Sequence, residues 1–158
     1  MSVRVITVSD RSFAGTREDV SGPLLASLFG TDDVVVVPDE VDAIATAVQQ
    51  AVAQGIDLVL TTGGTGVAPR DVTPEAVRPL LERELPGVME AIRAAGKVPT
   101  AALSRGVAGI VGRSFVVTLP GSTGGVRDGA EVLLRLTDHV REQLAGADHG
   151  PAEGTLEP

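Results

Sequence analysis

The sequence predicts a three-layer α/β domain with a mostly parallel sheet. Short apolar runs rich in β-branched residues alternate with segments of helical periodicity, and polar or glycine-rich stretches follow the apolar runs. At 158 residues the chain has the length of one domain. We therefore expect one α/β domain over residues 1–145. A disordered tail is expected over residues 146–158, where Gly, Pro and acidic residues are frequent.

The first two expected strands each end at a polar stretch. Residues 3–8 form a β-branched run, and Ser9-Asp10-Arg11 follows it as an expected loop. Residues 34–37 are four valines, which is typical of a strand buried on both faces. Between these strands, Ser21-Gly22-Pro23 predicts the start of a helix, since Pro is well tolerated in the first helical turn.

The middle of the chain gives the clearest helical pattern. Apolar residues recur at helical spacing over residues 42–54, and Gly55 ends the pattern. Residues 56–60 are then expected to form a buried strand that leads directly into a Thr- and Gly-rich loop. Beyond it, Thr73-Pro74-Glu75 predicts the start of another helix.

The second half is expected to hold a short helix, a helical turn, a hairpin and one long amphipathic C-terminal helix. These cover residues 88–95, 99–104, 107–119 and 126–144, respectively. Pro86-Gly87 interrupts the pattern before the short helix, and Gly112-Arg113 provides the turn of the hairpin. The hairpin predicts one antiparallel element near an edge of the sheet.

Composition excludes several classes of function. The net charge of −8 and a pI near 4.7 argue against nucleic-acid binding, and three Phe without Trp or Tyr offer little for base stacking. The absence of cysteine excludes disulfides, thiolate catalysis and Cys-ligated zinc. Neither a signal-peptide pattern nor a membrane-length apolar run is found, so we expect a cytoplasmic protein that does not bind membranes.

The Thr- and Gly-rich loop is the first candidate site. Its members follow a buried strand, where ligands of open α/β sheets bind: Thr61, Thr62, Gly63, Gly64, Thr65 and Gly66. Glycines let the backbone approach an anion and adopt positive φ, and threonines add hydroxyl donors. The alternative is an ordinary strand-to-helix turn. The P-loop and dinucleotide-binding glycine patterns are both absent, which argues against those two classes.

Two aspartates lie where they could share this site. Asp39 follows the valine strand, and Asp71 lies five positions beyond Gly66. Two carboxylates beside a phosphate repel it unless a cation lies between them, and Mg²⁺ suits that place. The alternative for Asp71 is a solvated or helix-capping role. Arg70 and Arg105 are candidates for pairing a phosphate, although surface ion pairs are the commoner role for a single Arg.

The motifs together resemble the molybdopterin-binding MogA/MoaB family, which includes the N-terminal domain of gephyrin and the plant Cnx1 G domain. The segment LVLTTGGTGVAPRDVTPEA, residues 58–76, carries the signature. Further matching motifs are VSDR, VPDE, RELPGV, LSR and LPGS, at residues 8–11, 37–40, 83–88, 103–105 and 119–122. Only the tail past about residue 146 lies outside the resemblance.

The resemblance implies a function and a set of site residues. It implies an αβα fold, a homotrimer or hexamer, and transfer of AMP from Mg-ATP to the terminal phosphate of molybdopterin. Asp39 and Asp71 match the family's aspartates important for activity, and they are the tentative Mg²⁺ ligands. The expected ligand-binding positions, besides the loop at residues 61–66, are Ser9, Asp10, Ser104, Pro120, Gly121 and Ser122.

One departure from the family pattern leaves an alternative open. The sequence PGSTGG at residues 120–125 is closer to MoaB-like members than to the MogA branch, which tends to have Pro-Lys after PGQ. The alternative function is therefore that of a non-catalytic molybdopterin-binding or assembly protein. A nucleotide hydrolase with a similar loop is a more distant alternative.

Overall fold

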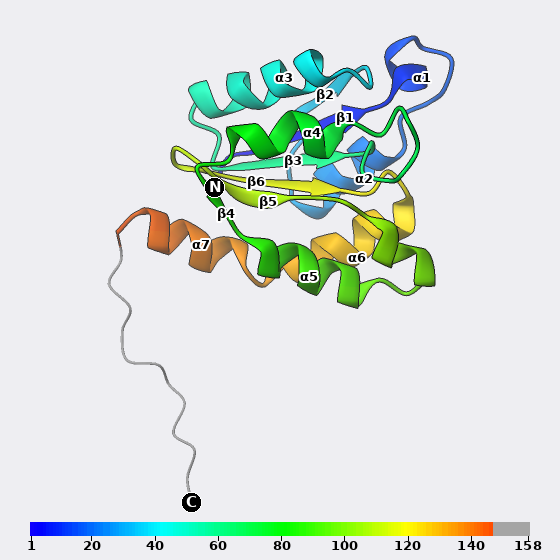
Figure 1. The fold of residues 1–158 in the computed structure, drawn as a ribbon. Coiled ribbons are helices and arrows are strands. Elements are labelled where there is room, and N and C mark those ends of the chain that lie inside the picture. The colour runs from blue at the N-terminus through cyan, green and yellow to red at the C-terminus, as the bar shows by residue number, and fades with distance from the viewer. Residues whose placement is uncertain (147–158) are drawn as a thin grey trace, which may run out of the picture.

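A six-stranded sheet in the order β2-β1-β3-β6-β5-β4 forms the centre of the computed structural model, which describes residues 1–146 (Figure 1). Four neighbouring strands are parallel: β1 (Val3–Val8), β2 (Val34–Val37), β3 (Leu58–Thr62) and β6 (Ser114–Leu119). Strands β5 (Ala108–Val111) and β4 (Arg83–Glu84) extend the sheet with antiparallel pairing. The predicted fold class is thereby confirmed.

Helices cover both faces of the sheet (Figure 1). One face packs against α3 (Val41–Ala53) and α4 (Thr73–Val77). The other packs against α2 (Ser21–Leu28), α5 (Pro86–Ala95), α6 (Thr123–Leu134) and α7 (Thr137–Leu144). Two short 3₁₀ helices, η1 (Arg78–Leu80) and η2 (Pro99–Leu103), complete the connections. Within residues 1–146, no helix is both long and apolar enough to cross a bilayer.

Two strands differ from the sequence prediction. Strand β3 runs over 58–62 rather than 56–60, because Thr61 and Thr62 pair with β1 on one side and β6 on the other. Strand β2 was expected to be buried on both faces, but it lies at the edge of the sheet, and Val35 is 37% exposed. The two-residue strand β4 was not predicted.

Three helices also differ. A short helix, α1 (Asp10–Phe13), replaces the loop expected after β1, and the Ser9 hydroxyl caps it by accepting a hydrogen bond from the Ser12 N–H. Helix α5 begins at Pro86 rather than after it. The long C-terminal helix is two helices, because tighter i→i+3 hydrogen bonds at Arg135 and Leu136 end α6. The predicted tail lies outside the described residues, apart from Gly146.

The topology gathers several loops at one edge of the sheet. The four parallel strands end there, so the segments after Val8, Val37, Thr62 and Leu119 are neighbours. Strand β5 runs the opposite way and therefore begins at the same edge, which brings in the segment before Ala108. Ligands bind at this edge in open α/β sheets.

Candidate functional site

A cavity of about 740 Å³ opens at this edge of the sheet, a volume typical of small-molecule sites. It lies between the loop after β3, the loop that leads into α6, and the segment from α5 to η2. The structure brings nine of the predicted site residues together in its wall. These are Gly63, Gly64, Thr65, Gly66, Asp71, Ser104, Pro120, Gly121 and Ser122.

The loop after β3 requires glycine for two separate reasons. Gly63 and Gly64 adopt positive φ of 103° and 67°, which side chains with a Cβ rarely tolerate. A Cβ at Gly63 would lie 2.3 Å from the carbonyl oxygen of Val8, so the backbone itself blocks any side chain there. Thr73 fixes the loop with two hydrogen bonds: its hydroxyl donates to Gly63 O and its N–H donates to Gly64 O.

The amino-terminal end of α6 forms the opposite wall. The Ser122 hydroxyl caps this twelve-residue helix by accepting from the Gly125 N–H at 3.1 Å. Gly124 and Gly125 line the cavity beside Ser122, so two positions of the first turn present backbone without a side chain. Helix amino termini attract anions through exposed N–H groups and the helix dipole. Two sides of the cavity therefore present groups of the kind that bind anions.

The rest of the cavity wall consists of residues that were not predicted from the sequence. Three basic side chains, those of Arg93, Lys97 and Arg127, line it together with the apolar residues Ile92, Val98, Ala101 and Leu103. The Lys97 ammonium lies 3.3 Å from a carboxylate oxygen of the buried Asp128. None of these residues belongs to a recognisable motif. The presence of a single lysine in an acidic chain was the one signal that could have drawn attention to Lys97.

Two of the threonines predicted to bind a ligand do not line the cavity. Thr61 and Thr62 belong to β3, and both side chains are fully buried. The Thr62 hydroxyl donates to Pro120 O at 2.9 Å and so joins the two loops, whereas the Thr61 hydroxyl has no hydrogen-bond partner among residues 1–146. Of the three threonines in the motif, only Thr65 lines the cavity, where its hydroxyl lies 3.5 Å from that of Ser104.

Valine substitution at Thr61 and at Thr62 should have opposite effects on stability. Thr61→Val removes a buried hydroxyl that has no partner, and we expect the free energy of unfolding to rise by about 1 kcal/mol. Thr62→Val removes the hydrogen bond to Pro120 and should lower it by about 1 kcal/mol. Urea unfolding of both variants measures the difference. A loss of stability in Thr61→Val would show that its hydroxyl does have a partner.

The two predicted aspartates flank the glycine loop. A Cβ at Gly66 would lie 2.8 Å from a carboxylate oxygen of Asp71, and one at Gly64 would lie 3.4 Å from a carboxylate oxygen of Asp39. Each carboxylate uses one oxygen for a backbone N–H, that of Ala68 for Asp71 and that of Asp10 for Asp39. The other oxygen of each accepts no hydrogen bond within residues 1–146. Side chains in that range form no group of three or more potential metal ligands.

Ser9, Asp10 and Asp39 lie beside the cavity rather than in its wall. Asp10 and Asp39 exchange hydrogen bonds, each carboxylate accepting from the other's backbone N–H. The Asp10 carboxylate also accepts two hydrogen bonds from the Arg70 guanidinium. The N–H of Asp39 and the Arg70 guanidinium hold the pKa of Asp10 below its ordinary value. Burial raises the pKa of Asp39, and the nearby charges of Asp10 and Asp71 add to this effect.

Asp39→Asn should raise the free energy of unfolding at neutral pH. The folded state raises the pKa of Asp39 above its ordinary value of 3.8. The free energy of unfolding therefore falls as the pH rises from 3.8 through the raised pKa, and it stays lowered at higher pH. Asparagine keeps the acceptor for Asp10 and carries no charge. We expect a gain of about 0.5 kcal/mol at neutral pH, kept small by solvent screening. Thermal unfolding across pH checks this, and Asp32→Asn, at an exposed position, is the control.

The guanidinium groups of Arg70 and Arg105 are both engaged by the protein. That of Arg70 pairs with Asp10 at 2.7 Å. That of Arg105 pairs with Glu75 and bonds the carbonyl oxygens of Gly66 and Asp71. The hydrogen bond from Arg105 holds the pKa of Glu75 below its ordinary value. Neither arginine lines the cavity, and both form ion pairs, the commoner of the two roles considered for them.

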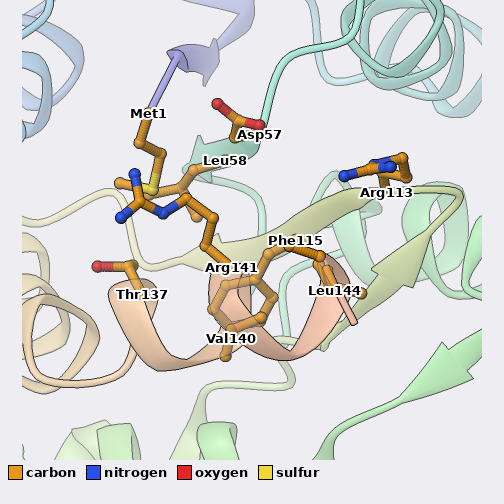
Figure 2. Close-up of a pocket in the computed structure, with 10 residues that line it drawn as sticks. Met1, Asp57, Leu58, Arg113, Phe115, Thr137, Val140, Arg141 and Leu144 are labelled. Atoms are coloured by element: carbon orange, nitrogen blue, oxygen red, sulfur yellow. The ribbon is translucent and has the colours of Figure 1, made fainter. Parts of the chain in front are cut away.

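A second hollow, at the amino-terminal end of β3, does not fit a ligand of this kind. Figure 2 shows Leu58 and Phe115 in its wall, with Asp57, Arg113 and Arg141 around it. Its volume is about 50 Å³, which suits a few water molecules. The larger cavity is the candidate functional site.

Known proteins share this fold and these motifs. Residues 4–139 match the family described as "Probable molybdopterin binding domain". The molybdenum cofactor biosynthesis bifunctional protein of Synechococcus elongatus is 44% identical over 157 residues, covering 95% of this chain and 49% of that protein. The chain thus spans about half the length of that relative. The molybdenum cofactor biosynthesis protein B of Staphylococcus aureus is 42% identical over 143 residues, 83% of each chain.

A solved structure extends the similarity to three dimensions. The crystal structure of a molybdopterin biosynthesis protein from Mycobacterium abscessus superimposes with a TM-score of 0.87 and 48% identity. The match covers 92% of this chain and 96% of that one. Since the family match covers most of its length and the relatives exceed 40% identity, the chain belongs to the molybdopterin-binding domain family of the MogA and MoaB proteins.

Proposed function

We propose that this protein acts in molybdenum cofactor biosynthesis as a molybdopterin adenylyltransferase. The observation that carries the proposal is the cavity at the carboxyl edge, where the glycine loop and the first turn of α6 lie in one wall with Asp71. Relatives named for molybdenum cofactor biosynthesis support the pathway. Molybdopterin and ATP both carry phosphates, so both substrates match the chemistry of this wall.

The cavity offers different surfaces to different parts of its substrates. Backbone N–H groups of the glycine loop and of the first turn of α6 would bind the terminal phosphate of molybdopterin. The apolar side chains of Ile92, Val98 and Leu103 would cover the ring system. Arg93, Lys97 and Arg127 would offset phosphate charge, which an acidic protein must do locally.

Asp39 and Asp71 are the residues that would hold Mg²⁺. Each has one carboxylate oxygen that accepts no hydrogen bond within the described range, and the two carboxylates lie near Gly64 and Gly66 of one loop. Mg²⁺ typically binds through one or two carboxylates together with substrate phosphates, so a larger cluster of ligands is unnecessary. When bound, the ion would neutralise phosphate charge that these carboxylates would otherwise repel.

The transfer needs no nucleophile from the protein. A terminal phosphate oxygen of molybdopterin attacks the α-phosphorus of ATP, a new P–O bond forms, and the bond to the β-phosphate oxygen breaks. Adenylyl-molybdopterin and pyrophosphate are the products. The protein contributes by placing two anions in line and stabilising their charge, the main requirement of such transfers. A wall of glycines, hydroxyls and basic side chains suits that role.

The activity is tested by mixing the purified protein with Mg-ATP and molybdopterin. We expect adenylyl-molybdopterin and pyrophosphate in equal amounts, detected by mass spectrometry and a pyrophosphate assay. Tight molybdopterin binding without ATP consumption would instead favour the non-catalytic alternative. ATP hydrolysis in the absence of any pterin would indicate the third alternative, a nucleotide hydrolase.

We also propose that the protein works as a homotrimer, as its family resemblance implies, with a hexamer as the alternative. Several large apolar side chains outside the cavity are exposed, among them Phe13 at 60% and Val67 at 70%. Light scattering coupled to size-exclusion chromatography determines the state directly. A monomeric mass at micromolar concentration would contradict the proposal.

A further inference from the structure

We propose that Arg105 is a positioning residue, which fixes the carboxylate of Asp71 at the cavity wall by holding both ends of the segment 66–71. Its contribution to catalysis rests on the adenylyl transfer proposed above, whereas its contribution to holding Asp71 does not. Arg105 does not line the cavity, although its neighbour Ser104 does. It therefore acts through the loop rather than on a ligand.

The guanidinium joins the two ends of the segment. Its Nε donates to Gly66 O at 2.8 Å, and its Nη2 donates to Asp71 O at 2.7 Å. The remaining nitrogen, Nη1, pairs with the Glu75 carboxylate on α4, which restrains the guanidinium from the far side. The backbone N–H of Arg105 donates to Thr65 O at 2.8 Å, so main chain and side chain contact the same loop.

Within residues 1–146, few other contacts fix the position of residues 67–70. Residues 67–70 are exposed, Val67 by 70%, so packing does not hold them. Asp71 and Ala68 exchange two hydrogen bonds, which shape the segment internally but do not attach it to the rest of the protein. The Arg70–Asp10 pair does attach it, but both side chains are largely exposed, and such pairs contribute little. Thr73 anchors the chain two residues beyond Asp71, through Gly63 and Gly64, whereas Arg105 attaches Asp71 itself.

Only arginine can make this set of contacts. Its planar group presents neighbouring N–H donors in a fixed fork, and here two nitrogens reach two carbonyl oxygens while a third meets a carboxylate. A lysine at this position keeps the positive charge but offers a single nitrogen. Arg105→Lys therefore tests the hydrogen-bonding geometry of the guanidinium apart from its charge. The ion pair with Glu75 can survive in this variant, while one end of the segment is released.

The experiment compares Arg105→Lys with the wild type by two measurements. Hydrogen exchange followed by NMR should show the amides of Ala68 and Asp71 exchanging about 10-fold faster in the variant, because the segment opens more often. The kcat of adenylyl transfer should fall about 10- to 100-fold as Asp71 moves from its position. The KM for ATP should change by less than about 3-fold, because the anion-binding wall is intact.

Two further variants separate positioning from simple stabilisation. Glu75→Gln removes the ion pair but leaves both carbonyl contacts, and it should affect exchange and kcat less than Arg105→Lys does. Arg78→Lys alters another exposed arginine pair, with Glu84, and should leave both measurements unchanged. Thermal unfolding confirms that each variant is folded.

Four outcomes are decisive. Unchanged amide exchange in Arg105→Lys overturns the proposal, as does an equal effect in Glu75→Gln, which would assign the role to the ion pair. Faster exchange with no change in kcat would show that Asp71 needs no fixed position. If the wild type transfers no AMP but the amides respond as expected, the function fails while the positioning of Asp71 stands.

Discussion

Asp71→Asn is expected to lower kcat for adenylyl transfer by about 100-fold or more, the scale of losing one preorganised charge-stabilising group. Asparagine can still accept the hydrogen bond from the Ala68 N–H, so the loop should keep its shape. The substitution removes the negative charge that the proposed metal ion would bind. Molybdopterin affinity should stay within a few-fold of wild type, since the glycine loop and the α6 terminus are unchanged.

Two measurements test this expectation. Single-turnover formation of adenylyl-molybdopterin gives the rate, and a Mg²⁺ titration shows whether the variant needs a higher metal concentration. The matched control is Asp32→Asn, which removes the same charge from an exposed position between α2 and β2. Wild-type kcat in Asp71→Asn, at ordinary Mg²⁺ concentration, would exclude Asp71 as a metal ligand.

Gly63→Ala is expected to lower the free energy of unfolding by about 2 to 4 kcal/mol, combining backbone strain with a steric clash. Its φ of 103° is unfavourable for alanine, and the new Cβ would lie 2.3 Å from Val8 O, in the adjacent strand. Relief would require β1 and β3 to separate at the edge that forms the site.

Gly55→Ala is the control that isolates the clash. Gly55 also has positive φ, 74°, but open space surrounds the position where a Cβ would be. Its replacement should cost about 1 kcal/mol through backbone conformation alone. Equal losses in the two variants, measured by urea unfolding, would mean that the loop after β3 can move away from β1.

The fold was largely predictable because its elements follow local patterns. The valine strand, the helix over α3 and the hairpin of β5 and β6 all have clear periodicity or turn residues. The errors share a different cause. Nothing in the sequence marks the break between α6 and α7, since apolar spacing continues across it without Pro or Gly. Strand β4 has two residues, too few for any pattern, and it exists through its pairing with β5.

The site was predictable only where its residues belong to a sequence motif. The glycine loop and Asp71 carry a motif, and the structure places both in the cavity wall. Arg93, Lys97 and Arg127 come from α5, its end and α6, elements that meet only through tertiary packing. Thr61 and Thr62 illustrate the converse, because residues of a motif can serve sheet pairing and loop anchoring rather than line the cavity.

The position of Lys97 has a practical consequence. It is the sole lysine among the 158 residues, its side chain is 78% exposed, and it lines the cavity. Amine-reactive reagents therefore have one side-chain target, besides the α-amino group. A fluorophore attached there would sit at the edge of the candidate site, and substrates entering the cavity would change its emission without any engineered cysteine.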